Sequence, residues 1–232
     1  MKFGRKKSDQ AAEQAEVEAP DDAGQPLDAE PAEEAEEAAD EVAAAQPPRS
    51  GGPYDIEDVE IDRDDENLID LGGLIIHARE GIELQMQVDE ESGVIMAVMM
   101  VGPDGAVELR PFAAPRNADI WDDARRSIAA EVTQRGGTAT EADGPFGREL
   151  QVVMPVELED GQHAQQPSRV LGVIGPRWLL RATLFGRPAL EPDEDGDIEN
   201  ALREVVVVRG NEPMPPGEAL PLTLPPNAVP AE

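Results

Sequence analysis

The stretch that decides the fold runs from Gly81 to Phe112 and reads GIELQMQVDEESGVIMAVMMVGPDGAVELRPF. Apolar and polar residues alternate over residues 82–88, which is the period of a strand with one buried face. Residues 94–101 are continuously apolar, as expected of a central strand that is covered on both faces. Turn residues separate these two runs from each other and from a third run at 107–112. The stretch therefore predicts a three-stranded antiparallel meander.

Two helices are predicted after the meander. The apolar residues that repeat at helical spacing and define the first are Trp121, Ala124, Ile128 and Val132. Asn117 or Asp119 is expected to cap this helix, and Gly136 with Gly137 is expected to end it. A second helix is expected over residues 195–205, where one face is shared by Ile198, Ala201, Leu202 and Val205.

Four further strands are predicted at residues 138–143, 149–156, 169–174 and 178–185. Turn residues join the first two strands, and likewise the last two, as hairpins. Residues 157–167 are expected to form a polar loop between the hairpins. Together with the meander, these elements predict an α+β domain, an antiparallel β-sheet of about seven strands flanked by two main helices.

Composition divides the chain into four segments. Residues 8–52 have almost no large apolar side chain and are rich in acids, so we expect residues 1–52 to be a disordered acidic arm with a basic tip. Residues 53–72 interleave apolar and acidic residues, and docking on the domain, partner binding and disorder all fit them. Residues 73–210 hold the α+β domain, and residues 211–232 read as an extended Pro-rich tail. The tail is expected to lie along the domain as a strap, because apolar residues alternate at Leu220, Leu222 and Leu224.

The chain carries 50 Asp and Glu against 19 Lys and Arg, which gives a formal net charge of −31. This field repels polyanions and argues against duplex nucleic acid or an anionic membrane as the partner. No apolar run approaches the roughly 20 residues that span a bilayer. The basic tip consists of Lys2, Arg5, Lys6 and Lys7, and no apolar core of a secretory signal follows it. We therefore expect a cytoplasmic protein, and the role of the tip stays open.

Catalytic motifs are mostly absent from the sequence. There is no cysteine, all three lysines precede Ser8, and the only histidines are His77 and His163. The glycine motifs of nucleotide-binding and hydrolase sites are also missing. The acidic run from Asp193 does not fit a calcium loop, because the twelfth position falls on Glu204, at the far end of the predicted last helix. We expect no metal, no cofactor and no catalytic residue, and we lean toward a protein that is not an enzyme.

Two arginine-bearing loops supply the candidate ligand-binding residues, which are Arg116, Trp121, Arg177, Trp178 and Arg181. Guanidinium groups suit carboxylates, so these arginines can gather an anionic ligand or the acidic arm. The alternative, which we favour, is that the arginines pair with local Asp and Glu while the tryptophans fill the core. Nothing in the spacing of these residues decides between the two interpretations.

Several motifs together resemble an actinobacterial family that is known only as a domain of unknown function. They are Pro111-Phe-Ala-Ala-Pro-Arg116, Trp121, Gly144-Pro-Phe-Gly-Arg-Glu-Leu150, Gly175-Pro-Arg-Trp-Leu-Leu-Arg181, Val205-Val-Val-Val-Arg-Gly210 and Glu212-Pro-Met-Pro-Pro216. The resemblance covers residues 53–225 and implies a cytoplasmic protein with an acidic extension and no assigned activity. The order of predicted elements is more distantly similar to the sandwich of PsbP-like and Mog-like proteins, which are mostly non-catalytic.

Two hypotheses of function follow from the sequence. The first is a non-enzymatic binding or accessory module that engages a protein partner through the sheet domain or the acidic arm. The second is a small anionic-ligand binder or carboxylate-dependent enzyme whose pocket is lined by Arg116, Arg177, Arg181 and Trp178. A pocket that holds at least two of these arginines and a carboxylate with a perturbed pKa would favour the second hypothesis, whereas arginines paired one by one on a convex surface would favour the first. The sequence predicts no oligomeric state.

Overall fold

The computed structural model describes residues 51–89, 91–116, 119–157 and 161–224. The expected acidic arm therefore lies outside the described residues, apart from Gly51 and Gly52, and so does the end of the tail. Among the described residues, no helix is long and apolar enough to cross a membrane.

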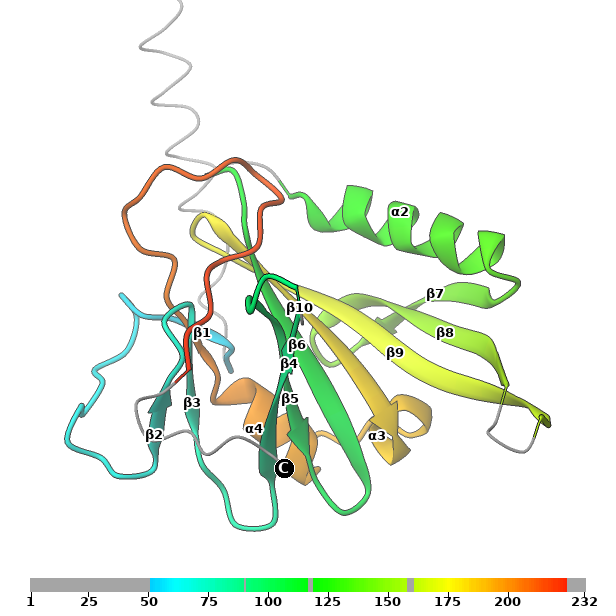
Figure 1. Cartoon of the computed structure of the whole chain (residues 1–232), viewed down its shortest axis with the longest axis horizontal. Coiled ribbons are helices and arrows are strands. Elements are labelled where there is room, and N and C mark those ends of the chain that lie inside the picture. Colours follow the sequence, from blue (N-terminus) through cyan, green and yellow to red (C-terminus); the bar gives the residue numbers. More distant parts are fainter. Residues whose placement is uncertain (1–50, 90, 117–118, 158–160, 225–232) are drawn as a thin grey trace, which may run out of the picture. The chain divides into compact units, whose positions relative to one another are not determined.

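A seven-stranded antiparallel sheet forms the centre of the domain (Figure 1). Its strands, in the order in which they pair, are β4 (Glu83–Val88), β5 (Ile95–Val101), β6 (Gly105–Ala113), β10 (Trp178–Gly186), β9 (His163–Gly175), β8 (Gly147–Glu157) and β7 (Thr138–Gly144). The predicted α+β class, the meander and both hairpins are confirmed. β6 and β10 join the meander to the hairpins, with Gly105 opposite Gly186 and Ala113 opposite Trp178.

The polar loop predicted at 157–167 is much shorter in the structure, so this prediction was wrong. β8 and β9 remain paired through this region, with Glu157 opposite His163 and Val156 opposite Ala164. A ladder needs only main-chain donors and acceptors, so it continues through polar side chains that face solvent. His163 consequently begins a strand instead of lying in a loop.

A second sheet of four strands was not predicted. Its order is β1 (Tyr54–Asp55), β11 (Val206–Val207), β3 (Leu74–His77) and β2 (Leu68–Asp70). β1 runs parallel to β11 and so pairs residues from opposite ends of the domain. Strands of two to four residues are too short to show a periodic pattern, which is why the sequence did not indicate them.

The helices described are α2 (Trp121–Gln134), α3 (Arg187–Leu190) and α4 (Asp197–Arg203). α2 and α4 are the two main helices that the sequence predicted, and α3 is a single additional turn. α2 lies across β7, β8 and β9 on one face of the seven-stranded sheet (Figure 1). α4 is shorter than predicted, because Asp193 and Gly196 form a turn before its first residue.

The two faces of the seven-stranded sheet bury separate cores. On one face, Leu109 and Leu180 pack in a large core with Leu74 of the second sheet and Leu202 of α4. On the other face, a smaller core lies beneath α2 and includes Trp121. Because alternate residues of a strand point to opposite faces, β9 and β10 contribute to both cores.

The described part of the tail lies along the domain. The Leu220 N–H donates to the Pro111 carbonyl and the Thr223 N–H to the Leu71 carbonyl, both at 2.9 Å. Leu220 and Leu222 are buried, as expected of a strap. The tail thereby covers the edge of β6 beyond its last β5 partner, Leu109.

Candidate functional site

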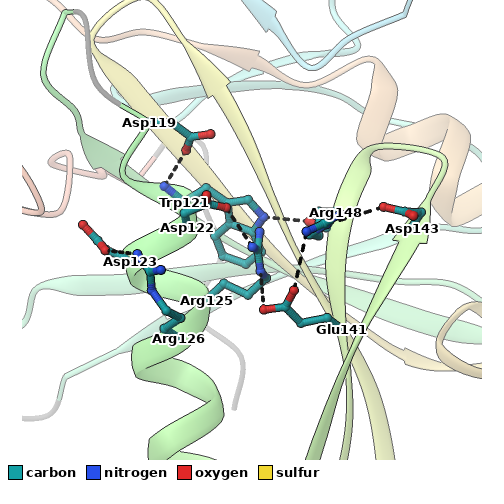
Figure 2. Close-up of polar contacts among 9 residues, drawn as sticks. All are labelled: Asp119, Trp121, Asp122, Asp123, Arg125, Arg126, Glu141, Asp143 and Arg148. Atoms are coloured by element: carbon teal, nitrogen blue, oxygen red, sulfur yellow. Dashed lines mark hydrogen bonds and ion pairs between the residues drawn. The ribbon is translucent and has the colours of Figure 1, made fainter.

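The two predicted tryptophans are buried in different cores. Trp178 belongs to the large core, and its indole Nε1 donates to Asp55 Oδ2 at 2.5 Å. Trp121 belongs to the small core, where its Nε1 donates to the Arg148 carbonyl at 2.7 Å (Figure 2). Trp121 also packs flat on β9, because a Cβ at Gly172 would lie 2.3 Å from its ring. The structure therefore separates these two residues.

The three predicted arginines lie in different elements of the structure. Arg116 is exposed in the loop before α2. Arg177 lies in the β9–β10 turn with a positive φ of 60°, and its Nη2 donates to the Gly210 carbonyl at 3.2 Å. Arg181 lies on β10 with its guanidinium 5.4 Å from the centre of the Phe112 ring.

A different group of residues lines a cleft of about 810 Å³. It contains Trp121 but none of the other four predicted residues. The lining consists of Gly51, Gly52, Asp119, Trp121, Asp122, Arg125, Pro145, Phe146, Arg148, Gly172, Val173, Ile174, Glu194, Asp195, Asn200 and Arg203. We call this hollow the β9 cleft.

The β9 cleft opens where β8 and β9 separate. The β8–β9 ladder ends at the pair Glu149 and Leu171, whereas the β9–β10 ladder continues to Gly175. Residues 172–174 of β9 are therefore paired on one side only, and all three line the cleft. The position of Trp121 accounts for this separation of β8 and β9. Its indole ring packs over Gly172, and its Nε1 donates to the Arg148 carbonyl, which would otherwise face β9.

Two of the arginines that line the cleft, Arg125 of α2 and Arg148 of β8, form ion pairs with nearby carboxylates (Figure 2). The side chain of Arg125 is only 6% exposed, and its guanidinium lies 2.7 Å from Asp122 Oδ1 and 3.1 Å from Glu141 Oε1. Arg148 is exposed and has longer contacts, 3.9 Å to Glu141 and 3.6 Å to Asp143. Such long, exposed ion pairs contribute little, so Arg148 is available to a ligand.

Arg203 faces the cleft from α4. Its guanidinium stacks 5.2 Å from the centre of the Phe146 ring and donates to Asn200 Oδ1 at 3.1 Å and to the Glu194 carbonyl. Within the described part of the chain, no carboxylate forms an ion pair with it. The β9 cleft thus combines a free strand edge with aromatic and cationic side chains.

A fully buried charge cluster lies in the same domain. The Arg169 side chain is 0% exposed, with Glu149 Oε1 at 3.4 Å and Glu199 Oε1 at 3.5 Å, and each glutamate side chain is 1% exposed. Among the described residues, no acceptor has hydrogen-bond geometry for any of the three guanidinium nitrogens. If both carboxylates are ionised, one negative charge in this buried cluster has no matching positive charge. Burying such a charge lowers the stability of the folded state.

Burial raises the pKa of Glu149 above its ordinary value of 4.5, and the nearby Arg169 opposes this only in part. A carboxyl group with a raised pKa binds its proton more readily in the folded state than in the unfolded state. Its contribution to stability is therefore complete below about pH 4.5 and is lost as the pH rises through the folded-state pKa.

The variant Glu149→Gln tests the direction of this pH dependence of stability. Because the amide carries no charge to desolvate, the stability of the variant relative to the wild type should increase as the pH rises from 4.5 to 7. Urea unfolding at several pH values measures the difference. A difference that stays constant or decreases with pH would show that the Glu149 carboxylate is stabilised by Arg169 more than it is penalised by burial.

The comparison with known protein families decides where this chain belongs. A family described as "Protein of unknown function (DUF3710)" matches residues 52–231. The chain belongs to this family. The match confirms the resemblance to a domain of unknown function that the sequence motifs indicated. No curated protein matches the DUF3710 chain.

One solved structure that is similar to the DUF3710 chain is the solution structure of cyanobacterial PsbP (CyanoP) from Synechocystis. It shares 12% sequence identity at a TM-score of 0.33, and the match covers 58% of this chain and 86% of that chain. No function follows from a likeness at this level.

Sequence reasoning missed Arg125, Arg148 and Arg203, which line the β9 cleft, and the buried Arg169. One signal for Arg148 was available, because it lies in the Gly144–Leu150 motif that carried the family resemblance. Arg125 follows Trp121 by four residues and so shares its face of α2. No pattern in the sequence marks Arg203 or Arg169.

Proposed function

We propose that this DUF3710 protein is a non-enzymatic binding module that engages a protein partner through the β9 cleft. The observation that carries the proposal is the one-sided pairing of residues 172–174 in the cleft wall. An unpaired strand edge recognises an extended peptide through main-chain hydrogen bonds, while adjacent pockets select its side chains. A cytoplasmic location stays a prediction.

The side chains around the edge support an extended peptide with an acidic residue. Arg148 lines the cleft from β8, where its ion pairs are long and exposed. Arg203 lines it from α4 and, among the described residues, forms no ion pair. Guanidinium groups suit a carboxylate on the incoming segment. Phe146, on which Arg203 stacks, also lines the cleft and supplies an apolar surface for a neighbouring side chain.

A small anionic ligand is the second candidate for the same cleft. It is favoured by Trp121 and three arginines lining one hollow, which is the kind of pocket that the sequence predicted around other arginines. The acids Asp119, Glu194 and Asp195 also line the cleft and oppose an anion that lacks a peptide backbone. We therefore place the peptide first.

Photocrosslinking tests the proposal. A benzophenone amino acid at Phe146 is expected to form protein adducts in cells, whereas the same group at Leu190, which is 65% exposed on α3 and outside the cleft, is not. Mass spectrometry of the adduct identifies the partner. With the purified partner, hydrogen exchange at the amides of residues 172–174 should slow, as expected for strand addition.

Matched arginine variants provide the control. Arg148→Glu should remove the Phe146 adduct, whereas Arg126→Glu should keep it, because Arg126 is a similarly exposed arginine outside the cleft. Adducts of equal yield from Phe146 and Leu190 would contradict the proposal. A ligand found by native mass spectrometry in place of an adduct would support the small-ligand candidate.

A further inference from the structure

Two arginines face each other on the seven-stranded sheet, away from the β9 cleft. Arg110 of β6 and Arg181 of β10 are direct cross-strand neighbours. Residues directly opposite each other in an antiparallel pair point to the same face, and like charges in this arrangement repel. Neither residue lines the β9 cleft.

The sheet face that carries this pair is covered unevenly. α2 makes most of its sheet contacts with β7, β8 and β9, so the part of the same face formed by β4, β5, β6 and β10 is less covered by this helix (Figure 1). The strand registers place further partly or fully exposed residues on this part of the face, namely Gln85, Gln87, Met99, Val101, Glu108 and Thr183. We call this surface the open face.

Only one member of the arginine pair forms an ion pair among the described residues, the contact between Arg110 and Glu108. Arg181 stacks over Phe112 and, within the described part of the chain, forms no hydrogen bond or ion pair. Arg110 Nε lies 3.3 Å from Glu108 Oε1, yet this buried nitrogen has no acceptor in hydrogen-bond geometry among the described residues. Burial, and then repulsion by Arg110, lower the pKa of Arg181, and the carboxylates of Glu108 and Glu131 offset this only in part.

A carboxylate between the two guanidinium groups would accept from both and remove their repulsion. Its neighbours would meet the apolar side chains of Met99, Val101 and Phe112. The net charge of −31 repels polyanions, so an isolated carboxylate suits this surface better than an acidic run. We propose that the open face binds a partner segment in which one carboxylate is flanked by apolar side chains.

This site goes beyond the function proposed above, because it shares no residue with the β9 cleft. Experiments can therefore contradict one of the two proposals and support the other. A partner can engage the strand edge alone, and a peptide can bind the open face of a protein whose cleft stays empty. Variants of Arg148 and Arg181 distinguish the two sites.

A peptide titration on the full chain, followed by amide chemical shifts in NMR, tests the proposal. The probe is an acetylated five-residue peptide with one glutamate between leucines, and we expect shifts at Glu108, Arg110 and Thr183. The same peptide with glutamine should bind about tenfold more weakly, because it loses charge-assisted hydrogen bonds. Pentaglutamate should bind more weakly than the glutamate probe at low salt.

Three variants locate the site. Arg181→Gln and, separately, Arg110→Gln should each remove most of the binding while the spectrum stays that of a folded protein. Arg126→Gln is the matched control on the solvent side of α2, where its side chain is 69% exposed, and it should leave binding unchanged. Two substitutions at the pair keep the test decisive if one of them unfolds the protein.

Four results would overturn the proposal. The first is equal affinity of the glutamate and glutamine peptides, and the second is binding that Arg181→Gln and Arg110→Gln both leave intact. The third is stronger binding of pentaglutamate or inorganic phosphate at the same residues, which would show a general anion site. The fourth is a shift of the resonances of residues 28–41 in Arg181→Gln, which would make the acidic arm of this chain the occupant.

Discussion

Arg169→Leu is expected to lower the free energy of unfolding by about 3–5 kcal/mol. The substitution leaves Glu149 and Glu199 buried side by side without a cation, and each side chain is only 1% exposed. Domains of this size are stable by about 5–15 kcal/mol in total, so the variant should approach the limit of folding. The midpoint of urea unfolding at pH 7 measures the effect.

Replacing all three charges distinguishes a buried cluster from a packing defect. Changing Glu149 and Glu199 to Leu together with Arg169→Met removes the desolvation of every charge while keeping similar volume, and it should recover most of the lost stability. If the triple variant is no more stable than Arg169→Leu, the guanidinium is needed for its shape and not for its charge. A mild effect of Arg169→Leu alone would show that water reaches the cluster.

Trp121→Ala is expected to cost about 3–5 kcal/mol, the range for large aromatic residues in a core. The indole packs over Gly172 and belongs to the small core, and its Nε1 donates to the Arg148 carbonyl. Trp121→Phe keeps most of the contact area and loses the hydrogen bond, so it should cost only about 1 kcal/mol. Urea unfolding followed by circular dichroism measures both.

A neighbouring substitution supplies the control. Asp123→Asn lies two residues further along α2, where Asp123 pairs only with the exposed Arg126. Exposed pairs contribute about 0–1 kcal/mol, so this variant should unfold close to the wild type. Equal effects of Trp121→Ala and Asp123→Asn would mean that the indole packs too loosely to hold β8 and β9 apart, and that the origin given for the β9 cleft is wrong.

The long periodic elements of the fold could be predicted from residue patterns. The alternation at 82–88, the apolar run at 94–101 and the helical spacing that begins at Trp121 each lie within one segment, and all correspond to described elements. The boundaries were less accurate where polar residues continue a ladder, as at the paired residues Glu157 and His163. Main-chain pairing there does not depend on side-chain polarity.

The candidate site could be predicted only in part. Of the predicted residues, Trp121 alone lines the β9 cleft, and the arginines that line it come from α2, β8 and α4. The interpretation that Trp121 and Trp178 fill the core matches their burial. Which arginines approach one another depends on strand register, and register is set by contacts between segments far apart in the chain.

The sequence by itself determined the α+β class, the seven strands of the large sheet, the two main helices and the absence of cysteine chemistry. Each of these features follows from a local residue pattern or from composition. Only the tertiary structure decided three other features. They are the second sheet, in which Tyr54 pairs with Val206, the buried cluster around Arg169, and the free edge of β9 at residues 172–174. Each brings together residues that are distant in the chain, and the free energy that holds them comes from burial in a shared core.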